Sequence, residues 1–278
     1  MSPFGRRLQK VGQSISSPSI VGWPDATNTG YTGALTLYTG TRSINADTTI
    51  SNAHITAGGF QIFAGATVTL TNCLIETPID ADYGTKLITL TDCTLNAGDT
   101  SEAGVHGAHL RITRCNITGG QHSVQGAGDC IVQDSWLHAQ YAGPVGSSYH
   151  NNAFISNGGT DMQIIHNTLD CSVPLNSTGG GPTADASIFG DFSSLARITF
   201  DHNLFKATTG GYGGTFGYNP TKPFGTNPSY IVVKNNVFEH GTTGVCGAYG
   251  PVTSFLSGGT GNVWSSNIYL DGQVIGPA

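Results

Sequence analysis

Charged residues are scarce in this chain. Lys, Arg, Asp and Glu make up 10% of its 278 residues, against about 25% in typical globular domains. The formal net charge is −6, and no tract is rich in Lys or Arg. Because binding to phosphate groups depends on clustered cations, this composition argues against specific nucleic-acid binding.

Long apolar runs are also absent. No segment approaches the roughly 18 consecutive apolar residues that a membrane-spanning helix needs, so we predict no membrane insertion. The basic cluster between Arg6 and Lys10 is followed by polar residues, so no secretory signal is predicted. We expect residues 1–19 to form a flexible arm or attachment segment. Either a signal was removed, or the protein leaves its cell by another route, such as lysis.

Paired cysteine motifs are missing. The chain has six Cys residues but no pair with CxxC spacing, which argues against a zinc site. Acidic residues do not gather in a calcium-binding pattern either. We therefore predict no metal and no cofactor, and six reduced cysteines, of which Cys246 alone has no assigned place in the fold.

Glycine, by contrast, is abundant, with 40 residues, and a short phrase recurs: TLTNCLIETP from Thr69, TLTDCTLNAG from Thr89 and RITRCNITGG from Arg111. The phrase returns about every 20 residues at first and every 31 to 36 residues later. Self-similarity at such a period indicates a solenoid. The repeated position that the cysteines mark is occupied in turn by Ala53, Cys73, Cys93, Cys115, Ser135, Asn167, Asn203, Asn236 and Asn267.

Two flanking columns are apolar in all nine repeats. They lie three residues before and two residues after the marked position, for example Leu70 and Ile75 around Cys73. Residues two apart on a strand share a face, so this pattern predicts two short strands per repeat with a tight bend at the marked position. We predict an all-β fold, a single parallel β-helix of about nine or more coils. Small side chains and then stacked Asn amides would line its interior.

The repeats also divide the chain. We expect residues 20–48 to cap the open end of the rod and residues 49–278 to form the coils, together one β-helix domain over residues 20–278. Later repeats are longer, and their extra residues fall at about 140–153, 172–191 and 207–229. We expect these loops to insert at one corner and to build a binding wall.

The chain resembles the right-handed parallel β-helix proteins of the pectate-lyase-like superfamily, and more closely those of actinobacteria and their phages. GWPDATNTG at 22–30 resembles their N-terminal signature, and IIHNTLDC at 164–171 and ITFDHNLFKATTGGYGGTFG at 198–217 resemble their later coils. The wider superfamily includes polysaccharide lyases, glycoside hydrolases and phage tailspikes, so the resemblance alone does not select an activity.

The candidate catalytic residues are Asp185, Asp191 and His150. Glycoside hydrolysis requires two carboxyl groups about 5 to 9.5 Å apart, which the two aspartates could supply if both faced the groove. Turn capping is the competing interpretation of these aspartates. Relatives often carry His-x-Asp-Gly where this chain has His150, Asn151, Asn152 and Ala153, and the amide of Asn152 cannot act as a general base.

The candidate glycan-binding residues are polar or aromatic. Aromatic faces with polar tips suit stacking on sugars, although such residues also pack loops onto a core. We expect His106, His122 and His150 to form a column along the groove. The expected glycan-binding set is His122, Asn152, Tyr212, Phe216 and Tyr218.

We therefore expect a phage tail-associated protein, a minor tail or spike component of the virion. Its expected partners are host cell-envelope glycan and other tail proteins, with a homotrimer by analogy to other β-helix spikes. A lyase or glycoside hydrolase, secreted or virion-bound, is the alternative. A purely structural tail element is the third possibility.

Overall fold

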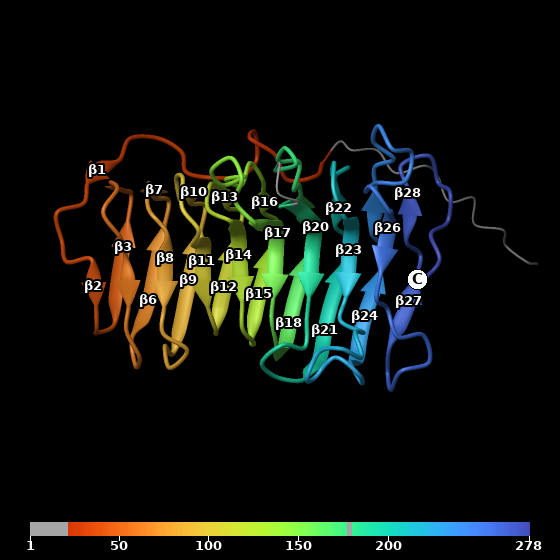
Figure 1. The fold of residues 1–278 in the computed structure, drawn as a ribbon. Coiled ribbons are helices and arrows are strands. Elements are labelled where there is room, and N and C mark those ends of the chain that lie inside the picture. The colour runs from red at the N-terminus through yellow and green to blue at the C-terminus, as the bar shows by residue number, and fades with distance from the viewer. Residues whose placement is uncertain (1–21, 177–179) are drawn as a thin grey trace, which may run out of the picture.

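The computed structural model describes residues 22–176 and 180–278. These residues form three parallel β-sheets that run along an elongated rod, as Figure 1 shows. Each turn of the chain contributes one strand to sheet A, one to sheet B and one to sheet C in succession. The predicted parallel β-helix is confirmed. The described residues contain no helix, and hence none that could cross a membrane.

The strands are short, as expected for a solenoid with a bend at every corner. Sheet A contains β1 Thr36–Leu37, β4 Ala53–Ile55, β7 Leu74–Ile75, β10 Thr94–Asn96, β13 Asn116–Thr118, β16 Trp136–Leu137, β19 Thr168–Leu169, β22 Leu204–Phe205, β25 Val237–Phe238 and β28 Ile268–Tyr269. Sheet B contains β2 Ser43–Ile44, β5 Gln61–Ile62, β8 Ile79–Ala81, β11 Ala103–Gly107, β14 His122–Gly126, β17 His150–Ser156, β20 Gly181–Ile188, β23 Tyr212–Phe216 and β26 Gly250–Thr253. Sheet C contains β3 Thr48–Ser51, β6 Thr67–Thr71, β9 Leu87–Thr91, β12 Leu110–Thr113, β15 Cys130–Gln133, β18 Gly159–Ile165, β21 Leu195–Asp201, β24 Ser229–Lys234 and β27 Val263–Ser265.

The tight bend between sheets C and A lies one residue before the position that the cysteines mark. In all nine repeats this residue has a left-handed backbone, with φ between 51° and 57°. Asn, Asp and His tolerate that conformation better than most residues, and they fill seven of the nine places. The column consists of Asn52, Asn72, Asp92, Arg114, Asp134, His166, His202, Asn235 and Ser266.

The next residue in each repeat points into the rod, and the last four form an amide ladder. The backbone N–H of Asn203 donates to Oδ1 of Asn236 at 2.9 Å, and its Nδ2 donates to the same atom at 3.0 Å. Asn167 donates to Asn203 in the same way, at 3.0 and 3.1 Å. The predicted stack of hydrogen-bonded amides is confirmed, and it satisfies buried polar groups that would otherwise have no partner.

All six cysteines are free and buried. The thiols of Cys73 and Cys93 each donate to a backbone oxygen two residues earlier, at 3.3 Å. Cys246, which the repeat pattern did not place, also lies in the core. The predicted reduced cysteines therefore act as small core residues.

The segment expected to cap the rod divides into two parts. Residues 36–44 add a first turn, in which β1 pairs with β4 and β2 with β5. The preceding residues run back along the outside of the rod, as Figure 1 shows above β1 to β16. Trp23 packs against His166 and His202, with ring centroids 5.3 and 5.1 Å apart. Residues 1–21, which include the expected arm, lie outside the described residues.

The extra residues of the later repeats lie at two corners, not at one. One set, such as residues 138–149 and 239–249, connects sheet A to sheet B. The other set, such as residues 189–194 and 217–228, connects sheet B to sheet C. The single-corner prediction is wrong because β20 and β23 lie within segments that were expected to be loops, and β17 begins within another. As a result, long loops flank the later strands of sheet B at both strand ends.

Candidate functional site

Half of the predicted site residues gather at the outer face of sheet B. A cleft of about 390 Å³ opens there over β14, β17 and β20. Four of the sequence-predicted residues line it: His122, His150, Asn152 and Asp191. We call this cleft the polar cleft. Its other lining residues are Gln121, Ile155, Asn157, Thr183, Phe189 and Lys222.

An irregularity in strand pairing shapes the floor of the polar cleft. The register between β17 and β20 shifts between Asn151 and Asn152, as in a β-bulge. Asn151 is fully buried, and its Nδ2 donates to the backbone oxygens of Gln121 and Tyr141 at 2.9 and 2.7 Å. These bonds tie the loop before β17 to the preceding turn. The shift leaves Asn152 beside His122, its pairing partner on β14.

Asn152 has most of its hydrogen-bonding capacity occupied within the protein. Its Oδ1 accepts a bond from the Ser187 hydroxyl at 2.7 Å, and its Nδ2 donates to the backbone oxygen of His150 at 3.2 Å. Nδ2 also lies 3.4 Å from Nδ1 of His122. Since its side chain is fully buried, Asn152 orients its neighbours and offers a ligand little.

His122 is uncharged near neutral pH. Burial, and then the charge of nearby His150, lowers the pKa of His122 to about 4. The amide of Asn152 donates to Nδ1, so the neutral ring carries its proton on Nε2. The ring can therefore donate a hydrogen bond from Nε2 to a neutral acceptor such as a hydroxyl oxygen.

The opposite wall of the cleft holds an ion pair. Nζ of Lys222 donates to Oδ1 of Asp191 at 2.5 Å, and it lies 5.5 Å from the centroid of the Phe189 ring. Lys222 comes from the loop after β23, and Asp191 from the loop after β20. The ion pair thus joins two neighbouring loops of the same wall and leaves little net charge in the cleft.

Carboxyl groups are not paired in the polar cleft. Asp191 is the one carboxylate among its lining residues, whereas glycoside hydrolysis generally uses two. Within residues 22–176 and 180–278, no group of three or more His, Cys, Asp and Glu side chains is arranged to hold a metal ion. The described cleft is best equipped to form hydrogen bonds with an uncharged polar ligand.

Two predicted site residues face the interior and not the cleft. Asp185 is fully buried, and its Oδ1 accepts a bond from the backbone N–H of Cys171 at 2.7 Å. Phe216 is also fully buried and packs against Phe200 and Trp264, with centroids 5.3 and 5.7 Å apart. The expectation that Asp185 could face the groove is wrong because its strand position places it on the inner side of sheet B.

The other predicted residues lie elsewhere on the same side of the rod. Strand pairing places Tyr212 in line with His122 and Asn152 across sheet B. Its ring packs against that of Tyr249, with centroids 5.8 Å apart, and it does not line the polar cleft. Tyr218 is partly exposed beyond the end of β23. The predicted histidine column does not form, because His106 pairs with Gln125 and lies three residues along from the partner of His122.

Sequence reasoning missed Lys222, Asn157 and Gln121. Lys222 is one of only eleven Lys and Arg residues and lies in the loop after β23, beside the aromatic residues that were singled out, which was a usable signal. Asn157 and Gln121 belong to no motif. They reach the cleft because they flank strands of sheet B, which the repeat pattern did not predict. No protein-family model, curated protein or solved structure matches the chain, so the geometry of the cleft is the basis for assigning a function.

Proposed function

We propose that this protein is a phage tail-associated component that engages host cell-envelope glycan on the outer face of sheet B. The observation that carries the proposal is the polar cleft. It combines a neutral His122, the amides of Gln121 and Asn157, and an Asp191–Lys222 ion pair with almost no net charge. Such groups donate and accept hydrogen bonds with sugar hydroxyls.

The proposal that the protein belongs to a virion is supported by its cysteines. Six free, buried cysteines suit a chain that folds in a reducing cytosol, where disulfides are rare. A phage structural protein folds in that compartment and reaches the exterior when the host lyses. A rod with a glycan cleft on one side then suits a minor tail or spike component, alone or as a homotrimer with other tail proteins.

The test is binding of the protein to an array of bacterial envelope polysaccharides. We expect Lys222→Met to weaken binding about tenfold, because it removes the cleft's cation and leaves Asp191 unpaired. Lys206→Met is the matched control. Lys206 pairs with Glu239 at the same 2.5 Å and with nearly the same exposure, but it follows β22 of sheet A and does not line the cleft.

Two results would contradict the proposal. One is that the wild-type protein binds no polysaccharide on the array. The other is that Lys222→Met binds as well as Lys206→Met. If a bound polysaccharide yields new reducing ends or unsaturated products, the protein is a hydrolase or a lyase and not a binding protein alone. In that case Asp191→Asn should abolish turnover.

A further inference from the structure

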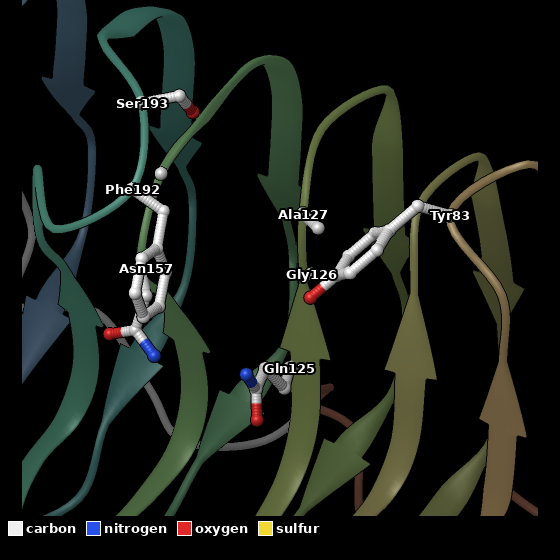
Figure 2. A pocket seen from close by; sticks show the side chains of 8 residues that line it. Tyr83, Gln125, Gly126, Ala127, Asn157, Phe192 and Ser193 are labelled. Carbon is white, nitrogen blue, oxygen red and sulfur yellow. The ribbon is translucent and has the colours of Figure 1, made fainter.

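A second cleft lies next to the polar cleft and shares Asn157 with it. It has a volume of about 450 Å³ and lies at the corner between sheets B and C, and we call it the aromatic cleft. Figure 2 shows the rings of Tyr83 and Phe192 on either side of Gln125. The remaining lining residues are Gly126, Ala127, Asn157, Gly158 and Ser193.

Both aromatic rings are unusually exposed. Tyr83 is 61% exposed and Phe192 is 78% exposed, although large apolar side chains usually find cover. They come from the turns after β8 and β20, which lie four strand positions apart in sheet B. At about 4.8 Å per position, their backbones are separated by roughly 19 Å along the rod. The two rings therefore flank a groove that is long enough for a chain of several units.

The Tyr83 ring is held in place from below. Its hydroxyl lies 3.1 Å from Nε2 of His106, and Nδ1 of His106 lies 2.9 Å from Oδ1 of Asp80. The Tyr83 and His106 rings also meet edge to face, with centroids 5.4 Å apart. An exposed ring that is already oriented loses little conformational entropy when a ligand stacks on it.

Phe192 is anchored through its backbone. Its N–H donates to the backbone oxygen of Asn157 at 3.0 Å, and the N–H of Asp191 shares that acceptor at 3.2 Å. Gly158 permits this approach, because a Cβ at that position would lie 2.7 Å from the backbone nitrogen of Ser193. The loop that places Asp191 in the polar cleft thus places Phe192 in the aromatic cleft.

Charge identifies the ligand class. The residues that line the aromatic cleft include no Asp, Glu, Lys, Arg or His, and Lys222, the one Lys or Arg side chain that lines the polar cleft, is paired with Asp191. Aromatic faces can stack on nucleobases or on sugar rings, but a nucleotide brings phosphate and a uronate brings a carboxylate. Neither anion would find an unpaired Lys or Arg side chain in the lining of the two clefts.

We infer that the two clefts form one continuous groove for an uncharged glycan, in which sugar rings stack on Tyr83 and Phe192 and hydrogen-bond to Gln125 and Asn157. The inference rests on the proposed glycan function and makes it specific: the ligand is a neutral polysaccharide and not a uronate. It also assigns Tyr83 and Phe192, in place of Tyr212 and Phe216, as the stacking residues.

The experiment is calorimetric titration of the full chain with cellohexaose, laminarihexaose and mannohexaose, and with hexagalacturonate as the anionic probe. At least one neutral hexasaccharide should bind about tenfold or more tightly than hexagalacturonate. Tyr83→Ala and Phe192→Ala should each weaken that binding about tenfold or more. Tyr83→Phe, which keeps the ring, should stay within about threefold of wild type. Tyr230→Ala removes an exposed tyrosine on β24 of sheet C, outside both clefts, and should leave the affinity unchanged.

Equal or tighter binding of hexagalacturonate would overturn the inference, and so would wild-type affinity in both alanine variants. If none of the three neutral hexasaccharides binds while the polysaccharide array shows a bound glycan, the inference of a groove for neutral glycans is wrong and the proposed function stands. If the array also shows no binding, both fail. Circular dichroism of each variant establishes that it is folded.

Discussion

Replacing Asn203 with Asp is expected to destabilise the protein by about 4 kcal/mol or more near neutral pH. Nδ2 of Asn203 donates to the oxygens of Ile164 and Asn236, at 2.8 and 3.0 Å. An ionised carboxylate of the same shape would bring a buried negative charge against both acceptors. Urea unfolding of the variant and wild type at pH 7 measures the difference.

Acid should reduce this loss. Once protonated, the introduced carboxyl group regains one donor, so its folded-state pKa is raised above the unfolded value of about 3.9. For such a group, the stability that is present below the unfolded pKa is lost as the pH rises toward the folded pKa. Asn227→Asp, the same change at an exposed position, should leave the free energy of unfolding nearly unchanged both at pH 7 and in acid. A loss below about 1 kcal/mol for Asn203→Asp would contradict the ladder as a stabilising element.

Replacing Asp185 with Asn is expected to stabilise the protein by about 2 to 4 kcal/mol at pH 8 and to have little effect near pH 4. Burial raises the pKa of Asp185 well above its usual range, and the charges of Asp170 and Glu239 add to this. The unfolded carboxyl ionises at about pH 3.9, whereas the folded one retains its proton. Stability is therefore present at low pH and lost as the pH rises. Asn keeps the acceptor for the Cys171 N–H and removes this pH dependence.

Thermal or urea unfolding between pH 4 and pH 8 gives the comparison. Asp99→Asn, the same change at an exposed residue, is the control and should leave the pH dependence as in wild type. If Asp185→Asn loses stability at pH 8, the buried carboxylate must be ionised and paired. That outcome would restore Asp185 as a candidate for chemistry.

The repeat was predictable because every turn faces the same physical demand. Leu70 and Leu90 must fill the core on consecutive turns, and Asn167 and Asn203 must satisfy each other's backbone and amide groups. Such demands leave columns in the sequence. The fold class, the inward ladder and the buried cysteines could be inferred from them.

The sheet B strand of each turn has a weaker sequence pattern than the other two strands, and the errors about the site follow from that. Strands of sheet B contain Gly and polar residues, such as Gly213 and Asn152, and their flanking loops differ in length. Without that strand, the inward direction of Asp185 and Phe216 could not be assigned. Tyr83, Gln125 and Phe192 come together only through the stacking of separate turns, which no single stretch of sequence encodes.

The most direct measurement is a crystal structure of the protein with the neutral hexasaccharide that binds best. We expect sugar density along the outer face of sheet B, crossing Asn157, with rings against Tyr83 and Phe192 and hydroxyls near His122 and Asp191. Density on another face, such as the ion-paired surface of sheet C around Arg111 and Arg197, would contradict it.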